Sequence, residues 1–113
     1  MAKYDANLDT LFTALGDPTR RDILARLARG PATVSELHAP HDMALPSFMG
    51  HLAKLEAGGI ITTHKEGRVR TATLNPAAFA PAQSWLDEQR AHWESRLDRL
   101  DDYVTQLMKE RAQ

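Results

Sequence analysis

Apolar residues recur every three to four positions through the first half of the chain, and glycine or proline interrupts the pattern at intervals. This periodicity is typical of amphipathic helices separated by short connections. It predicts four helices, at residues 5–15, 18–29, 33–38 and 45–57.

Capping residues mark where two of these helices begin. Asp17 followed by Pro18 is the usual pairing of an N-cap with a proline in the first turn. Thr33 and Glu36 have the spacing of a capping box, in which each side chain binds the backbone of the other residue. In the fourth helix we expect one buried stripe, formed by Leu45, Phe48, Leu52 and Leu55.

A β-hairpin and a long helix are predicted after the fourth helix. Residues 60–64 and 69–74 are rich in β-branched side chains, and Glu66-Gly67 supplies the turn between them. Asn75-Pro76 closes the hairpin and starts a brief helical turn. Pro81 then opens a helix that continues to about Lys109, which would be on the order of 40 Å long.

The last helix carries an apolar stripe at heptad-like spacing, which predicts a dimer. A domain of 113 residues has little else to cover such a helix, so the natural partner is the same helix of a second copy. The residues that we assign to this dimer interface are Leu86, Trp93, Leu97, Leu100, Val104 and Leu107, together with Leu8 and Leu11 of the first helix.

These elements predict a fold that is mainly α with a small β-hairpin. A helix-turn-helix at about residues 33–58 is followed by a hairpin, or wing, at about 60–74, and this order is the layout of a winged helix-turn-helix domain. A C-terminal dimerisation helix at about 81–110 completes it. We expect residues 1–113 to form one domain of this type.

Composition narrows the function classes. There are no cysteines, so disulfides, thiolate metal sites and cysteine nucleophiles are excluded. No apolar run approaches the roughly 18 residues that span a bilayer, and no signal peptide opens the chain, so we expect a cytoplasmic protein without a membrane partner. The net charge is −1, but residues 17–30 and 50–70 are mildly basic whereas residues 82–113 are acidic. This asymmetry is compatible with one surface that faces DNA.

Double-stranded DNA is the partner that the fourth helix and the hairpin tip favour. The outer face of the helix is small and polar, and the tip carries three cations within six residues, which suits phosphate or minor-groove contact. Each feature also has a plain alternative: a solvated helix face, or a turn whose charges block a strand edge. The predicted DNA-binding residues are Thr33, Pro46, Ser47, Met49, Gly50, His51, Lys54, Lys65, Arg68 and Arg70.

An ordered series of segments resembles the ArsR/SmtB-type repressors. The segments are residues 14–24 (ALGDPTRRDIL), 35–37 (SEL), 45–52 (LPSFMGHL), 55–61 (LEAGGII) and 66–70 (EGRVR). The resemblance covers nearly the whole chain. It implies a dimeric repressor that leaves its operator when an inducer binds, often a metal ion.

The metal-sensing residues of that family are missing from this chain. The family's Cys-x-Cys pair follows Glu-Leu in the third helix, where this sequence has His38, Pro40, His41 and Asp42. The last helix offers only His92, with Glu88 one turn earlier, in place of the family's second metal site. We therefore predict no metal and no cofactor, and an effector would be a small molecule that the sequence does not identify.

Two other functions are open to the chain on its sequence. An enzyme would need convergent chemistry, and neither a phosphate loop nor a nucleophile elbow is present, so we predict no catalysis. A winged-helix module that binds proteins without binding DNA is the alternative to a regulator. Trp85 and Trp93 fit two interpretations as well, because they can fill a dimer core or line an effector pocket.

Overall fold

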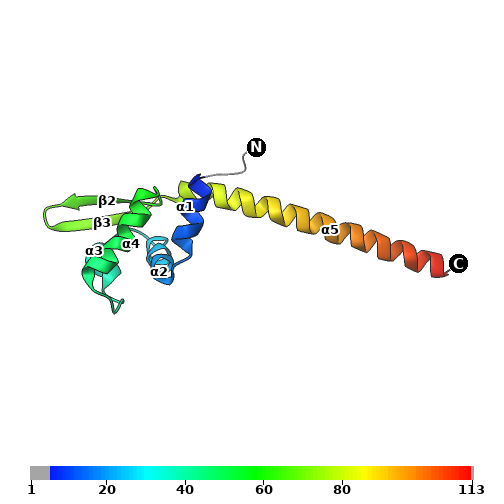
Figure 1. The fold of residues 1–113 in the computed structure, drawn as a ribbon, viewed down its shortest axis with the longest axis horizontal. Helices are drawn as coiled ribbons and strands as arrows, with labels where there is room; N and C mark the ends of the chain where they lie inside the picture. Colours follow the sequence, from blue (N-terminus) through cyan, green and yellow to red (C-terminus); the bar gives the residue numbers. More distant parts are fainter. Residues whose placement is uncertain (1–5, 113) are drawn as a thin grey trace. The chain divides into compact units, whose positions relative to one another are not determined.

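The structure, a computed structural model, describes residues 6–112, so the predicted helical residue Asp5 lies outside the described part. The chain comprises two compact units, Met1–Ala82 and Gln83–Gln113. The first unit holds the helix-turn-helix and the wing, and the second is the main length of the last helix (Figure 1).

The order of elements is that of a winged helix-turn-helix domain, which confirms the predicted fold class. The elements are α1 (Ala6–Leu15), α2 (Pro18–Leu27), β1 (Ala32–Thr33), α3 (Val34–His38), α4 (Leu45–Ala57), β2 (Ile61–Glu66), β3 (Val69–Leu74), the 3-10 helix η1 (Pro76–Phe79) and α5 (Ala80–Ala112).

Both predicted helix caps are present. The Asp17 carboxylate accepts a hydrogen bond from the backbone N–H of Arg20 at 3.0 Å and begins α2. At α3, the Thr33 hydroxyl oxygen accepts from the Glu36 N–H at 3.1 Å, and the Glu36 carboxylate accepts from the Thr33 N–H at 2.9 Å. These reciprocal bonds satisfy amides that would otherwise lack partners in the first turn of the helix.

The sheet contains one strand that the sequence pattern did not predict. Its order is β1-β3-β2 and both pairings are antiparallel, with Ala32 opposite Ala72 and Thr33 opposite Thr71. The hairpin turn is also displaced from its predicted place. Glu66 pairs with Val69, so the turn is formed by the two residues between them, and not by Glu66-Gly67. Gly67 has a φ of 65°, a left-handed conformation that a residue without Cβ adopts at no steric cost.

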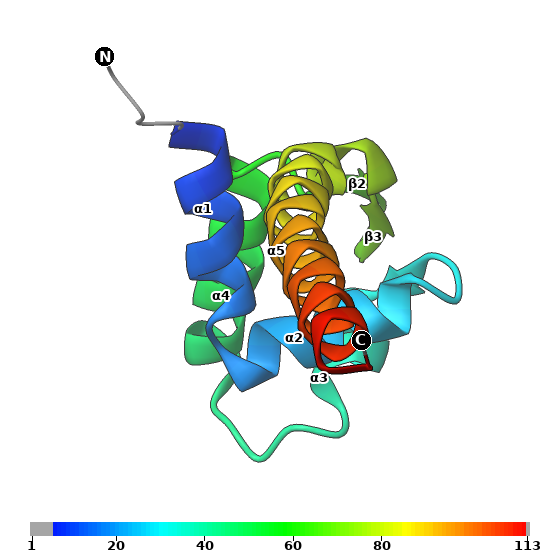
Figure 2. The ribbon, with the colours of Figure 1, turned by 90° about the vertical axis from the view of Figure 1, so that its right-hand side faces the viewer.

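One hydrophobic core joins α1, α2 and α4 to the base of the sheet, with α1 running alongside α4 (Figure 2). The largest fully buried side chains among the described residues are Leu11, Ile23, Phe48, Leu55, Ile60 and Ile61.

Two sequence-based assignments are wrong. Leu11 is only 2% exposed, so its side chain belongs to this core and not to a surface that a second copy can cover. Leu45 is 49% exposed and not part of the buried stripe of α4. It is the first residue of the helix, where Cβ tilts toward the N-terminus and past the end of the packed turn.

The last helix is longer than predicted. It runs for 33 residues from Ala80, one position before the proline expected to open it, and its length is therefore about 50 Å. Its large apolar side chains are exposed: Trp85, Leu86, Trp93, Leu97, Leu100, Tyr103, Val104, Leu107 and Met108. Within residues 6–112, no helix is both long and apolar enough to cross a membrane.

Candidate nucleic-acid interface

A groove of about 380 Å³ lies between the start of α3, the middle of α4 and the wing. Its lining residues are Thr33, Val34, Ser35, Met49, Lys65, Arg68, Val69 and Arg70. Five of them were predicted as DNA-binding residues, and they come from three parts of the fold: the N-cap of α3, the middle of α4 and the wing. The fold therefore gathers on one surface side chains that are up to 37 positions apart in the sequence, from Thr33 to Arg70.

The small sheet connects the wing to the helix-turn-helix. Thr33 caps α3 and also pairs with Thr71 of β3, so the first turn of α3 is attached to the strand that carries Arg70. Because the wing and α3 share this pairing, cations on the wing are held in register with the helix-turn-helix.

The wing concentrates positive charge at the groove. Lys65 and Arg70 are directly opposite each other in the β2–β3 pair, and like charges in that position lower the stability of a sheet. Among the residues that the structure describes, neither they nor Arg68 form an ion pair. Three uncompensated cations on one short hairpin are an arrangement that suits an anionic ligand.

The exposed face of α4 is open. Pro46, Ser47 and Gly50 are exposed, and a Cβ built at Gly50 would meet no atom within 4 Å. Gly50 therefore has no packing role within the protomer, although its small size allows another molecule to approach the helix backbone. Met49 is half-buried between the core and the groove.

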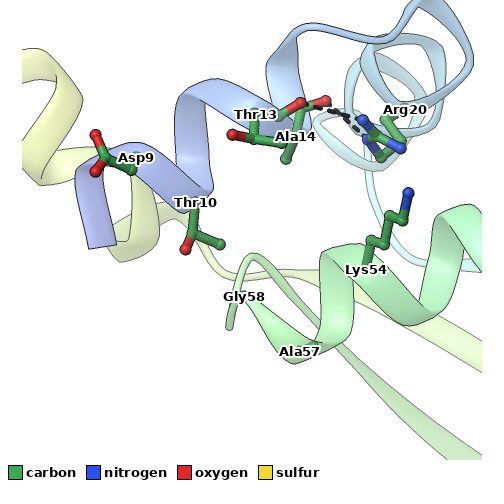
Figure 3. Close-up of a pocket in the computed structure, with 8 residues that line it drawn as sticks. All are labelled: Asp9, Thr10, Thr13, Ala14, Arg20, Lys54, Ala57 and Gly58. Atoms are coloured by element: carbon green, nitrogen blue, oxygen red, sulfur yellow. Dashed lines mark hydrogen bonds between the residues drawn. The ribbon is translucent and has the colours of Figure 1, made fainter. Parts of the chain in front are cut away.

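His51 and Lys54 lie apart from this groove. The His51 Nδ1 atom lies 3.0 Å from Arg20 Nη1 and 3.7 Å from the Asp17 carboxylate, so this side chain contacts α2. Lys54 lines a separate pocket between α1 and α4, together with Arg20 (Figure 3). The structure thus brings together five of the ten predicted residues, leaves three along the face of α4, and places these two elsewhere.

Three residues of the groove were missed by sequence reasoning. Val34 and Val69 carry no chemistry that a sequence pattern could single out, and only the pairing of β1 with β3 brings them close. Ser35 had a detectable signal, because it stands in the first turn of the predicted α3, where backbone N–H groups favour negative charge.

Two carboxylates beside the helix starts are held in their charged form. Hydrogen bonds from the backbone N–H and side chain of Thr33 lower the pKa of Glu36 below its ordinary value. The backbone N–H of Arg20 is the main cause that lowers the pKa of Asp17, and the charge of the Arg20 guanidinium adds to it. Both groups serve the helix caps, so neither is free to act as an acid or base.

His38, the last residue of α3, and His41, just after the helix, make local contacts. The His38 Nε2 atom lies 2.7 Å from the Met43 carbonyl oxygen and donates to it, since a carbonyl only accepts. The His41 Nε2 atom lies 2.8 Å from the Asp22 carboxylate, an ion-pair distance without good hydrogen-bond geometry. Within the described residues, no three His, Cys, Asp or Glu side chains gather into a group that could hold a metal ion.

Comparison with known proteins agrees with this geometry. A family model described as "Helix-turn-helix domain" matches residues 15–64. The chain is 34% identical to the HTH-type transcriptional regulator Rv2034 of Mycobacterium tuberculosis, over 70% of this chain and 74% of that protein. It is 29% identical to the transcriptional repressor SdpR of Bacillus subtilis, over 70% of this chain and 88% of that protein.

Solved structures share the fold. The crystal structure of the ArsR family transcriptional regulator RHA00566 is 57% identical, with a TM-score of 0.78, and the match covers 84% of this chain and 98% of that one. An ArsR-like transcriptional regulator from Rhodococcus sp. RHA1 is 29% identical with a TM-score of 0.68, over 84% of this chain and 90% of that one. On its helix-turn-helix, its wing and these relatives, the chain belongs to the ArsR family of winged helix-turn-helix transcriptional regulators.

Proposed function

We propose that this protein is a dimeric repressor that binds an inverted-repeat DNA operator through α3, α4 and the wing. The observation that carries the proposal is the groove in which Met49 of α4 meets the unpaired wing cations Lys65, Arg68 and Arg70. A winged helix places its second helix in the major groove, so base edges would face α4 while phosphates would face the wing.

The residues of the interface divide into two roles. Ser47 and Met49 would read bases, because a hydroxyl can bind a base edge and a thioether side chain can contact a thymine methyl. Pro46 and Gly50 would allow the helix backbone to come close to the groove floor. Lys65, Arg68, Arg70 and the Thr33 hydroxyl would bind the DNA backbone.

His51 keeps one nitrogen for DNA. The guanidinium of Arg20 can only donate hydrogen bonds, so the His51 Nδ1 atom is the acceptor in their contact. The hydrogen of the neutral ring is therefore on Nε2. That N–H could donate to a phosphate oxygen. Lys54, further along α4, would reach a phosphate only by turning out of the pocket that it lines.

The exposed stripe on α5 supports the dimer. Leu86, Trp93, Leu97, Leu100, Val104 and Leu107 are between 38% and 58% exposed, and their heptad-like spacing suits packing against a second copy of the same helix. The Mycobacterium bovis domain Mb0332, which shares the fold at 24% identity and a TM-score of 0.59, is described as homodimeric. For this chain, the proposal of a dimer rests on the exposed apolar stripe of α5.

The test of DNA binding is a fluorescence anisotropy titration with DNA from the protein's own upstream region, repeated at several salt concentrations. Arg68→Ala/Arg70→Ala should weaken binding to all sequences alike and reduce the salt slope by roughly one for each lost phosphate contact. The matched control is Lys109→Ala/Arg111→Ala at the end of α5, which should leave both quantities unchanged. If the wing variant had unaltered affinity and salt slope, the wing would not contact DNA.

The form of the operator separates this function from its alternative. A two-fold dimer should select an inverted repeat whose half-sites lie one helical turn apart, about 34–36 Å, or a multiple of that. Ser47→Ala should change the preferred base at particular positions of the repeat. Selection from random DNA that enriched no sequence would favour a module that binds proteins without DNA.

A further inference from the structure

The pocket between α1 and the C-terminal half of α4 has charges of opposite sign at its two ends. It has a volume of about 420 Å³, within the range of small-molecule sites. Figure 3 shows Asp9 at one end, on α1, and Lys54 reaching toward Arg20 at the other. Its remaining lining residues are Thr10, Thr13, Ala14, Ala57 and Gly58.

The charges at both ends are available to a ligand. Within the part of the chain whose side chains the structure describes, neither Asp9 nor Lys54 forms an ion pair or a side-chain hydrogen bond. Arg20 is only 7% exposed and its three nitrogens bind the Ala14 carbonyl, the Thr13 carbonyl and His51. Its role at this end is therefore a fixed positive charge near the Lys54 ammonium.

The two helices that form the pocket approach each other closely at Gly58. A Cβ built at Gly58 would lie 2.9 Å from the Thr10 methyl group, so α1 and α4 approach closely because position 58 is glycine. Asp9 and Thr13 are one helical turn apart on α1, as are Lys54 and Gly58 on α4. The pocket thus spans about one turn of each helix, roughly 6 Å along the axis.

We propose that this pocket binds a small amino-carboxylate whose two charged ends are separated by a short aliphatic chain. The carboxylate would bind Lys54 beside the charge of Arg20, the ammonium group would bind Asp9, and the chain would lie against Ala57 and Gly58. A carboxylate alone would leave Asp9 unpaired, and a phosphate would place a second negative charge near that aspartate.

The site would also oppose DNA binding, a consequence that rests on the proposed function. Lys54 is one of the cations predicted to bind a phosphate, and it cannot bind a ligand carboxylate and a DNA phosphate at the same time. Arg20 also binds His51, which is on α4 as Lys54 is. A ligand at this end of the pocket therefore lies beside two predicted DNA contacts.

The binding experiment is an amide-resolved NMR titration of the full chain without DNA. The probes are 5-aminopentanoate, pentanoate, pentylamine and inorganic phosphate. We expect 5-aminopentanoate to give saturable shifts at both Asp9–Ala14 and Lys54–Gly58, and to bind about tenfold more tightly than either singly charged analogue, because each lacks one charged contact. Equal binding of pentanoate or phosphate, or no saturation at millimolar concentration, would overturn the proposal.

Matched variants locate the site. Asp9→Asn and Lys54→Gln should each weaken 5-aminopentanoate about tenfold, whereas Asp98→Asn and Lys109→Gln on α5 should not. Ala57→Phe should fill the pocket and abolish binding, and Ala53→Phe, one turn earlier on α4 and outside the pocket lining, is its control. Weakening by the control variants to the same extent would show that the shifts are not specific to this pocket.

A second arm tests the link to DNA with the native protein and Asp9→Asn, which changes no predicted DNA contact. Added 5-aminopentanoate should lower the operator affinity of the native protein, and about tenfold more ligand should be needed for the variant. If the protein bound the ligand in the NMR titration but bound no DNA, the proposed function would be contradicted and the ligand site would stand. Native and variant responses that coincide would overturn the proposed regulation.

Discussion

Arg20 on α2 donates a hydrogen bond to His51 on α4, with 3.0 Å between Nη1 and Nδ1. The same guanidinium donates to the Ala14 and Thr13 carbonyl oxygens at 3.0 and 3.1 Å, so one buried side chain connects the end of α1, the start of α2 and the middle of the proposed recognition helix. A cation at the C-terminal end of α1 also complements the helix dipole.

We expect Arg20→Met to lower the free energy of unfolding by about 2–4 kcal/mol, because it removes these bonds and leaves buried acceptors without donors. Arg21→Met is the matched control. Arg21 is exposed and, among the residues that the structure describes, its side chain donates only to the Leu15 carbonyl, so its loss should be below about 1 kcal/mol. Urea unfolding of both variants checks this, and similar losses would show that the Arg20 network does not stabilise the fold.

Two apolar residues of α4 should differ sharply on truncation. Phe48 is 0% exposed and its ring lies beside those of His38 and His41, at centroid distances of 5.0 and 5.4 Å. Phe48→Ala should therefore cost about 3–5 kcal/mol of stability. Leu45→Ala, at a side chain 49% exposed, should cost about 0.5 kcal/mol or less. If thermal or urea unfolding showed equal losses of stability for the two variants, Leu45 would have to be a core residue.

The charge of Asp17 should make stability depend on pH in the acidic range. Its folded-state pKa is lowered, chiefly by the backbone N–H of Arg20, so its contribution is present above the ordinary value of about 4 and is lost as the pH falls through the lower folded-state pKa. Asp17→Asn keeps a capping oxygen without the charge. The native protein should have the higher urea midpoint at pH 7, and the gap should close in strong acid. Asp98→Asn on α5 is the control, and a gap that persists unchanged in acid would contradict this account.

The apolar stripe of α5 should hold the dimer together. Leu100→Asp places a carboxylate within the stripe, where desolvation without a partner costs several kcal/mol, and should dissociate or unfold the protein. Ala91→Asp lies on the opposite face of the helix and should have no such effect. Sedimentation equilibrium at micromolar concentration should give twice the 12.6 kDa chain mass for the native protein and for Ala91→Asp. If the native protein were a monomer, the assignment of the α5 stripe to a dimer interface would be wrong.

We predict that no metal ion at His38 and His41 controls DNA release. The His38 Nε2 atom is bound to the Met43 carbonyl oxygen, and the His41 Nε2 atom lies 2.8 Å from the Asp22 carboxylate. A tight site needs three or four ligands with supporting contacts. Titration of the protein–DNA complex with zinc, nickel and cobalt should leave affinity unchanged. Metal-dependent release that disappears in His38→Ala/His41→Ala would show the prediction to be wrong.

Local sequence patterns were enough to predict most of the helices, their caps and the presence of a hairpin. Asp17-Pro18, the Thr33–Glu36 capping box and the limits of α4 were all predicted, because capping and hydrophobic periodicity act between residues only a few positions apart. The heptad-like stripe of α5 was visible for the same reason. For the proposed DNA-binding surface, the sequence suggested candidate residues but not which of them line one groove.

Which of these side chains contact one another depends on long-range packing. The two-residue strand β1 exists because Ala32 and Thr33 pair with residues about forty positions away, and a segment that short has no pattern of its own. The same long-range packing buried Leu11 and placed Lys54 beside Arg20, away from the wing groove. Burial and pairing depend on segments that are distant in the chain, so local sequence patterns could not predict them.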